Sequence, residues 1–443
     1  MNVEQLAAQC EERLRRDGVP AERPRHTYFV PGRIEVLGKH TDYAGGRSLV
    51  CTVEQGIWLT AVPRRDARVL VCDAVSGERC DCLFRRDLEV VTGWANYART
   101  VVRRIARDFR GDLCGADIAF ASNLPSAAGL SSSTALVIAI FLGLSSSNAL
   151  ETTPEYRANI ASNEDLAEYL SAMESGRSYR QFVGDAGVGT RGGSQDQAAI
   201  LCARAGQLLQ CSFAPVRVEG FVELPRGYVF AVGVSGVTAE KTGNAIALYN
   251  GAVDQMDRVT ELWRARLGGG DLLAGALLER EPGAVEQLRA ALRAADDGQG
   301  RAGALLARAD QFIAETREII PAAVTALRRG ALTTFGTLVD RSHQLAVTAL
   351  GNQVDETIFL ARSARELGAG AASAFGAGFG GSVWALIETA NAESFLEQWR
   401  TAYVARFPAR AHAARFLSSR PGAPARRLAP ADDYPHPPAG AVS

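Results

Sequence analysis

Charged side chains and glycines crowd the segment at 31–50, which reads PGRIEVLGKHTDYAGGRSLV. Arg33, Lys39, His40 and Asp42 supply the hydrogen-bond donors and acceptors that a small ligand rich in hydroxyl groups requires. Such residues are also common as salt-bridged groups on an exposed turn, where each pair contributes little. The segment becomes a candidate binding site because three further segments with chemical potential follow it along the chain.

The second segment, LPSAAGLSSSTAL at 124–136, leads into an apolar helix. The free N–H groups at a helix start, with their partial positive charge, suit a phosphate group. Gly129 would let the backbone approach an anion closely, and Ser131, Ser132 and Ser133 add hydroxyls for phosphate oxygens or Mg²⁺. The segment lacks the GxxxxGK[ST] pattern of a Walker loop. A serine-capped buried helix is the alternative.

Two glycine-rich segments complete the set: GTRGGSQDQAAI at 189–200 and SAFGAGFGGSVWALI at 373–387. Asp196 precedes a helix, so it is either an N-terminal cap or a general base that faces a substrate hydroxyl. A cationic neighbour would keep such a base ionised. The glycines between 376 and 381 suit a loop pressed against a nucleotide or sugar, and a tight turn is the alternative.

The surrounding sequence predicts an α+β protein. β-branched and aromatic residues indicate strands at 26–38, 47–63, 67–74 and 115–125. Helices are expected at 134–144 and 155–182, and the stretch from 243 to 370 is dominated by helical sequence rich in Ala, Leu and Arg. We expect one domain at 1–215, a second at 216–425, and a Pro- and Ala-rich, poorly ordered tail at 426–443.

Composition limits the classes of partner. The 443 residues are 47% hydrophobic and 22% charged, with a formal net charge of −1, so neither a basic stripe for nucleic acid nor a polybasic membrane anchor is expected. The longest apolar run, at 134–144, is too short to cross a bilayer, and the N-terminus lacks the apolar region of a signal peptide. We expect a cytoplasmic protein, a monomer or weak homo-oligomer, with small-molecule partners.

The cysteines and lysines are unevenly used. Eight cysteines lie between residues 10 and 211, with neither zinc-ligand spacing nor a disulfide framework. Among 48 basic residues only Lys39 and Lys241 are lysines. Both lie in segments of interest, so either a compact ammonium is needed there or the placement is chance.

In this order, the four segments resemble the GHMP kinase superfamily and, within it, the galactokinases. GRIEVLGKHTDYAGG is similar to the galactokinase signature, LPSAAGLSSSTAL to the superfamily's ATP-phosphate motif, and SAFGAGFGG to its third motif. WANYARTVVRRI at 94–105 and FGTLVDRSHQLA at 335–346 also match galactokinase sequences. The resemblance extends from about residue 25 to residue 425.

This resemblance implies an N-terminal domain like ribosomal protein S5 domain 2 and a ferredoxin-like C-terminal domain, with the active site between them. It implies transfer of the γ-phosphoryl group of ATP, with Mg²⁺, to the anomeric hydroxyl of a hexose, with galactose as the leading acceptor. A related sugar such as galacturonate, or a sensor that binds sugar and ATP without catalysis, are the alternatives. The serine motif, Asp196 and Arg33 are intact, which disfavours a sensor.

The resemblance also implies residue roles. Asp196 matches the catalytic aspartate, and Arg33 matches the arginine that stabilises that carboxylate and the transferred phosphoryl group. The remaining implied roles are sugar binding by Lys39, His40, Asp42 and Tyr249; phosphate binding by Gly129, Leu130, Ser131, Ser132 and Ser133; adenine contact by Trp94 and Tyr97; and magnesium binding by Ser133 and Glu174.

Two departures from the family pattern bear on specificity. Lys39 stands where galactokinases carry glutamate, at the position expected to contact the primary hydroxyl of the sugar. A lysine can donate to that hydroxyl, but by charge it would suit an acidic group better. The loop before Asp196 is longer than in galactokinases and adds Arg191, so that Glu174 lies farther from Asp196 in sequence than in that family.

Overall fold

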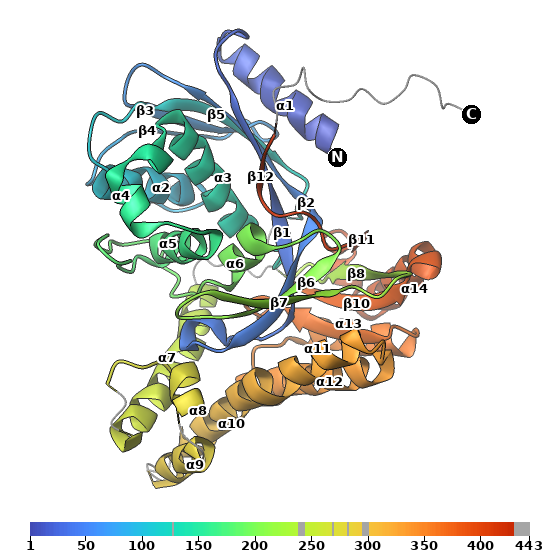
Figure 1. Cartoon of the computed structure of the whole chain (residues 1–443). Coiled ribbons are helices and arrows are strands. Elements are labelled where there is room, and N and C mark those ends of the chain that lie inside the picture. Colours follow the sequence, from blue (N-terminus) through green and yellow to red (C-terminus); the bar gives the residue numbers. More distant parts are fainter. Residues whose placement is uncertain (126–127, 238–243, 268–269, 281–282, 295–300, 429–443) are drawn as a thin grey trace.

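A computed structural model describes the chain except residues 126–127, 238–243, 268–269, 281–282, 295–300 and 429–443 (Figure 1). Lys241 and most of the predicted tail therefore lie outside the described residues. Within the described part, no helix has both the length and the apolar character needed to span a bilayer.

The N-terminal half is built on a mixed sheet of eight described strands (Figure 1). The order is β12-β1-β2-β5-β3-β4, and β6 and β7 extend it as a hairpin paired to β2. The strands are β1 (His26–Leu37), β2 (Arg47–Pro63), β3 (Arg68–Asp73), β4 (Arg79–Leu83), β5 (Ala116–Ser122), β6 (Gln207–Ser212), β7 (Arg217–Glu223) and β12 (Arg426–Leu428). The strands predicted at 26–38, 47–63, 67–74 and 115–125 are confirmed as β1, β2, β3 and β5.

Helices cover both faces of this sheet. Successive side chains of a strand point to opposite faces, and here the side chains on both faces are apolar and buried. Trp58, Val62 and Ala119 pack on α1, whereas Leu59 and Ile118 belong to the core under the helices of the other face. The helices of this half are α1 (Val3–Arg16), α2 (Ala95–Asp108), α3 (Ser132–Ser147), α4 (Pro154–Asn159), α5 (Asn163–Ser175) and α6 (Gln195–Cys202).

The helix predicted at 134–144 is confirmed as part of α3, and the helical character predicted for 155–182 is confirmed only as far as residue 175. That stretch contains α4 and α5, and helix ends at Ser175. Gly176 follows with φ of 79°, the left-handed conformation that commonly terminates a helix.

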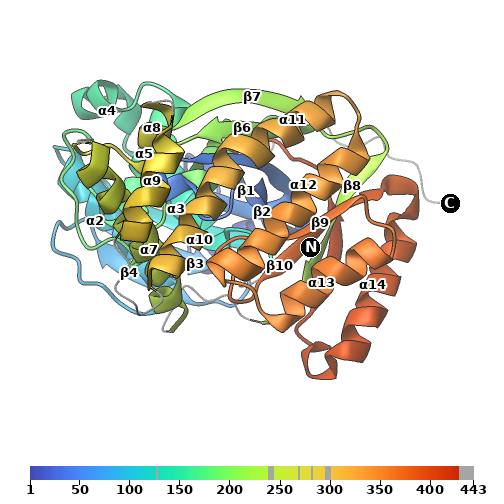
Figure 2. The same cartoon turned by 90° about the horizontal axis from the view of Figure 1, so that it is seen from below.

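The C-terminal half contains a smaller antiparallel sheet in the order β11-β8-β10-β9. Its strands are β8 (Tyr228–Val234), β9 (Ala371–Phe375), β10 (Ser382–Glu388) and β11 (Arg415–Ser419), and α13 (Asp355–Glu366) and α14 (Ala392–Arg406) cover one face (Figure 2). Helix follows β8 and β10 but not β9, which is the β-α-β-β-α-β order of ferredoxin-like folds. The predicted ferredoxin-like half is present.

Between β8 and β9 the chain forms a long helical insertion (Figures 1 and 2). It comprises α7 (Asn244–Leu267), α8 (Ala274–Arg280), α9 (Ala284–Ala294), α10 (Arg301–Ile313), α11 (Ile320–Arg328) and α12 (Leu332–Leu345), with π-helical turns at Ala314–Ile319 and Ala346–Leu350. Tyr43 and Ala44, from the loop after β1, are buried in the core of this insertion. The insertion therefore holds the HTDY segment in place.

The chain changes sheets later than the predicted boundary between residues 215 and 216. That boundary falls in the turn between β6 and β7, and both strands belong to the larger sheet. The change occurs between Glu223 and Tyr228. Residues 426–428, assigned to the tail by the sequence, pair with β1 because the chain returns to the larger sheet after β11.

Candidate functional site

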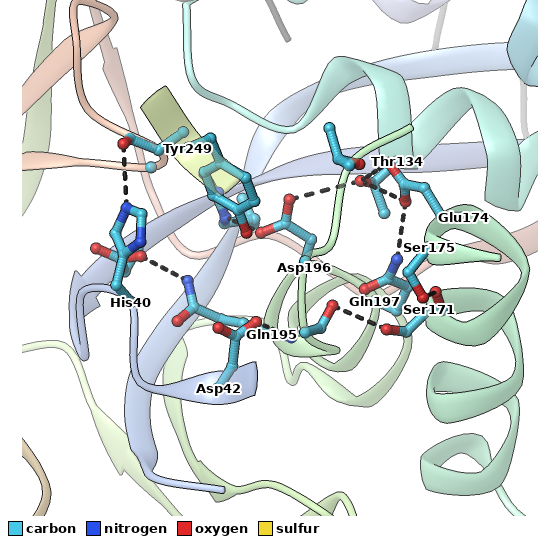
Figure 3. Close-up of a pocket in the computed structure, with 17 residues that line it drawn as sticks. His40, Asp42, Thr134, Ser171, Glu174, Ser175, Gln195, Asp196, Gln197 and Tyr249 are labelled. Atoms are coloured by element: carbon cyan, nitrogen blue, oxygen red, sulfur yellow. Dashed lines mark hydrogen bonds and ion pairs between the residues drawn. The ribbon is translucent and has the colours of Figure 1, made fainter. Parts of the chain in front are cut away.

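A pocket between the two halves collects side chains from all four segments of interest (Figure 3). Its empty volume, including space open to solvent, is about 550 Å³. The described residues that line it are Arg33, Glu35, His40, Asp42, Thr134, Ser171, Glu174, Ser175, Thr190, Gly192, Gly193, Gln195, Asp196, Gln197, Tyr249, Gly376 and Ala377.

Arg33 and Asp196 form an ion pair in this pocket although 163 positions separate them in sequence. Arg33 Nε on β1 lies 2.7 Å from Asp196 Oδ1 in the first turn of α6. The other end of the guanidinium donates to the carbonyl of Gly129, and the Ser131 hydroxyl donates to Asp196 Oδ2. The arginine fork therefore joins the carboxylate to the start of α3, the predicted phosphate-binding element.

The start of α3 has an unusual backbone. Ser131, which precedes the first residue of α3, has a left-handed φ of 59°. This conformation is costly for a residue with a side chain and is found often at functional sites. Here it accompanies a hydroxyl that contacts Asp196 instead of capping the helix.

A second carboxylate, Glu174 of α5, lies beside this pair. Thr134 Oγ1 is 3.0 and 3.2 Å from the two carboxylate oxygens of Glu174 and 3.5 Å from Asp196 Oδ2. Gln197 Nε2 also donates to Glu174, at 2.9 Å (Figure 3). The described residues contain no cluster of three or more His, Cys, Asp or Glu that would hold a metal unaided. One carboxylate with nearby hydroxyls does fit Mg²⁺, which takes few protein ligands when substrate phosphates supply the rest.

His40 and Asp42 line the side of the pocket formed by the HTDY loop. His40 Nε2 lies 3.1 Å from the Ala377 carbonyl, to which it must donate, and Nδ1 lies 3.1 Å from the Tyr43 hydroxyl. Burial lowers the pKa of His40 to about 4, and the charge of Arg308 adds to this effect. His40 is therefore a neutral hydrogen-bonding group at pH 7.

Asp42 joins the HTDY loop to the loop before α6. Its Oδ2 accepts a hydrogen bond from the backbone N–H of Gln195 at 3.2 Å, and burial raises its pKa. A Cβ atom at Gly193 would lie 2.4 Å from that oxygen, so only glycine permits this approach. The glycines before Asp196 thus serve close packing at the site.

Tyr249 comes from α7, near the start of the helical insertion. Its ring centroid lies 5.3 Å from that of His40, and it lines the pocket together with Gly376 and Ala377 of the third motif. The insertion, the HTDY loop and the loop between β9 and β10 therefore meet at one end of the pocket.

Glu35 also lines the pocket, and the sequence analysis did not identify it. The residue is 3% exposed, and its Oε2 accepts from Gln195 Nε2 at 2.7 Å. Burial raises the pKa of Glu35 to about 7, although the charges of Lys39 and Arg33 and the Gln195 amide oppose the rise. Its position two residues after Arg33 on a strand, where side chains at i and i+2 share a face, was a signal that could have found it.

We expect the stability contribution of Glu35 to depend on pH. Its folded pKa of about 7 exceeds the ordinary 4.5, so its stabilising effect is complete below pH 4.5 and is lost as pH rises through 7. The unfolding free energy of the wild type, relative to Glu35→Gln, should fall by roughly 3 kcal/mol between pH 4.5 and pH 8. Denaturant unfolding of both proteins across this range measures the change, and a constant difference would contradict it.

Lys39 is placed differently from its predicted sugar contact. The side chain is 1% exposed and is not among the described residues that line the pocket. Its Nζ lies 3.4 Å from the hydroxyl of Ser342, which itself donates to Glu315. Lys39 therefore lies behind the described pocket lining, and its sugar contact stays a prediction.

The predicted nucleotide residues are not among the described residues that line the pocket. Gly129, Leu130, Ser132 and Ser133 flank Ser131 at the start of α3, whereas Ser126 and Ala127 of the same motif lie outside the described residues. Trp94 and Tyr97 lie at the start of α2, where Trp94 Nε1 donates to Glu78 at 2.6 Å. The adenine, phosphate and metal roles of these residues remain predictions.

Several site residues escaped the sequence analysis for different reasons. Gln195 and Gln197 flank Asp196, and Ser171 and Ser175 are spaced for one helix face with Glu174, so local pattern could have indicated them. Arg308 could not be found this way. It is fully buried in the insertion, and its guanidinium donates to the His40 carbonyl at 2.6 Å.

Comparison with known proteins finds matching family models and relatives. Family models match at residues 18–63 (galactokinase galactose-binding signature), 96–204 (GHMP kinases N terminal domain) and 323–405 (GHMP kinases C terminal). A galactokinase of Roseiflexus sp. is 28% identical over 382 residues, which cover 84% of this chain and 86% of the relative. A galactokinase of Exiguobacterium sibiricum is 26% identical over 395 residues, 85% and 88% of the two chains.

Solved structures share the fold. Lactococcus lactis galactokinase complexed with galactose matches with a TM-score of 0.75 at 21% identity, over 95% of this chain and 99% of that one. Methanococcus jannaschii mevalonate kinase matches with a TM-score of 0.55 at 12% identity, over 90% and 99%. The α+β class and the two-domain architecture expected from the sequence are confirmed. With both domains matched in sequence and in fold, this chain belongs to the GHMP kinase superfamily.

Proposed function

We propose that the protein is a galactokinase, which transfers the γ-phosphoryl group of ATP to the anomeric hydroxyl of galactose. The ion pair of Arg33 and Asp196, in a pocket that adjoins the start of α3, is the observation that carries the proposal. The match of residues 18–63 to the galactose-binding signature and the galactokinase relatives support galactose as the acceptor.

In the proposed reaction, Asp196 receives the proton of the anomeric hydroxyl while the hydroxyl oxygen forms a bond to the γ-phosphorus. The bond from that phosphorus to the bridging oxygen breaks, and ADP leaves with the electron pair. Arg33 pairs with Asp196 and faces the charge of the transferring group. Catalysis of this kind depends mainly on positioning and electrostatics.

Glu174 and the serines at the start of α3 are the residues that would hold Mg²⁺. Bound there with ATP, the ion would neutralise phosphate charge. Thr134 and Gln197 fix the Glu174 carboxylate by hydrogen bonds, which keeps it oriented without the ion.

An ADP-release assay over galactose, galacturonate, glucose, arabinose and a heptose tests the proposal. We expect the highest kcat/KM with galactose, and ³¹P NMR should identify the product as the sugar 1-phosphate. Calorimetric titration with ATP and each sugar provides the control. Binding of both ligands without ADP release would contradict the kinase proposal and indicate a sensor, and a preference for galacturonate would contradict the choice of acceptor.

A further inference from the structure

Behind one wall of the pocket lies a buried network of charged groups, made of Glu35, Lys39 and Glu315 with Ser342. The exposed fractions of the three charged residues are 3%, 1% and 0%. Glu315 accepts from the backbone N–H of Gly38 at 3.2 Å and from the Ser342 hydroxyl, which also lies 3.4 Å from Lys39 Nζ. The charge of Lys39 acts on both carboxyl groups, because it opposes the rise that burial causes in the pKa of Glu35 and of Glu315.

Glu35 is the member of this network that lines the pocket. Its Oε2 accepts a hydrogen bond from Gln195 Nε2. The Ser48 hydroxyl in turn donates to Gln195 Oε1 at 2.7 Å, which fixes the orientation of that amide. Its Oε1 is buried and has no hydrogen-bond partner among the described residues. A buried acceptor left unsatisfied is costly, so this oxygen indicates a missing donor.

The position of Glu35 limits which donor this is. Arg33 and Glu35 lie two residues apart on β1, which corresponds to about 7 Å along a strand and to the same face. Arg33 contacts Asp196, at the end of the pocket assigned to the anomeric hydroxyl. A sugar that reaches Asp196 with its anomeric hydroxyl would present a different hydroxyl to Glu35.

We propose that Glu35 Oε1 accepts a hydrogen bond from a non-anomeric hydroxyl of the sugar, and that Glu35, not Lys39, is the specificity-determining residue of this network. The inference rests on the proposed sugar kinase function. An ionised Glu35 attracts a hydroxyl and repels a carboxylate, so the pocket selects neutral sugars over uronic acids. The charge of Lys39 helps to keep Glu35 ionised, since it opposes the effect of burial on the pKa of both Glu35 and Glu315.

Glu35→Gln, assayed with galactose and its monodeoxy derivatives, tests this inference. Loss of a hydrogen bond to a charged acceptor should raise KM for galactose about ten- to a hundredfold, with a much smaller change in kcat. In the wild type, one monodeoxy galactose should have a kcat/KM that is lower than that of galactose by a similar factor, because it lacks the hydroxyl that Glu35 binds. In Glu35→Gln, the kcat/KM values for that deoxy sugar and for galactose should be nearly equal. The ratio of kcat/KM for galacturonate to that for galactose should rise in the variant.

Glu315→Gln is the matched control, because Glu315 is equally buried and near Lys39 but does not line the pocket. This variant should keep the wild-type pattern among the deoxy sugars. A crystal structure of the wild type with galactose gives a second measurement that does not depend on folding of a variant. It should show Glu35 Oε1 within hydrogen-bonding distance of a sugar hydroxyl.

The outcomes separate this inference from the proposed function. If the wild type phosphorylates galactose but Glu35→Gln keeps its KM and its pattern among the deoxy sugars, the inference is wrong and the kinase function stands. A crystal structure in which Lys39, not Glu35, contacts the sugar also overturns it. If the wild type phosphorylates no sugar, the proposed function fails first.

Discussion

Asp196→Asn is expected to lower kcat for galactose phosphorylation by about a thousandfold, with little change in the affinity for ATP. The amide keeps the size of the carboxylate but cannot take the proton of the anomeric hydroxyl. It also cannot form the ion pair with Arg33. Single-turnover kinetics would measure the chemical step, and calorimetric titration would measure ATP binding.

The control for this variant is Asp117→Asn on β5. Asp117 Oδ1 pairs with Arg64 at 2.7 Å, the same distance as in the Arg33 and Asp196 pair, and its side chain is 8% exposed. It does not line the pocket. The control should lose stability but keep kcat. Near-normal turnover by Asp196→Asn would exclude Asp196 as the catalytic group.

Arg33→Lys should lower kcat by about a hundredfold or more, although the charge is kept. The guanidinium bridges Asp196 and the Gly129 carbonyl with two different nitrogens, and a lysine ammonium is a single point charge that cannot reproduce this fork. The lysine variant should also unfold at lower temperature, because one ammonium in this buried position cannot keep both the contact to Asp196 and the hydrogen bond to the Gly129 carbonyl. Steady-state kinetics and thermal unfolding measure the two effects.

A comparison of variants separates catalysis from stability in this case. Arg64→Lys alters the matched pair with Asp117 and should lose stability alone. The double variant Arg33→Lys with Asp196→Asn should be slower than Asp196→Asn by less than the loss that Arg33→Lys causes alone, because part of the effect of Arg33 is exerted through Asp196. Multiplicative loss in the double variant would show that Arg33 does not act through Asp196.

Local sequence patterns predicted the elements that carry the site. The strands β1, β2 and β5 and the apolar helix α3 were predicted because side-chain alternation and apolar runs are properties of short segments. The helical character predicted for 155–182 extends only to residue 175, because an apolar pattern says little about where a helix ends. Gly176 ends α5 in a left-handed conformation. The chain leaves the larger sheet only after β7, because β6 pairs with the distant β2 and β7 pairs with β6.

The four chemical segments were also recognisable without a structure, because their residue types and order are written in the chain. Arg33, Asp196, His40, Asp42, Glu174 and Tyr249 all line one pocket. Their meeting depends on contacts such as that between Asp42 and the backbone of Gln195, 153 positions apart. No local pattern encodes contacts of this range.

The different placement of Lys39 and Glu35 was decided by the tertiary structure alone. On a regular strand, residues 33, 35, 37 and 39 would share a face. The pairing of β1 with β2 shifts register between Glu35 and Leu37, β1 ends at Leu37, and Gly38 and His40 follow with φ of 102° and 56°. These turns leave Glu35 in the pocket and bury Lys39 near Ser342. The sequence by itself determined which charged groups the site contains, but which of them lines the pocket depended on the backbone path, because side-chain direction follows from it.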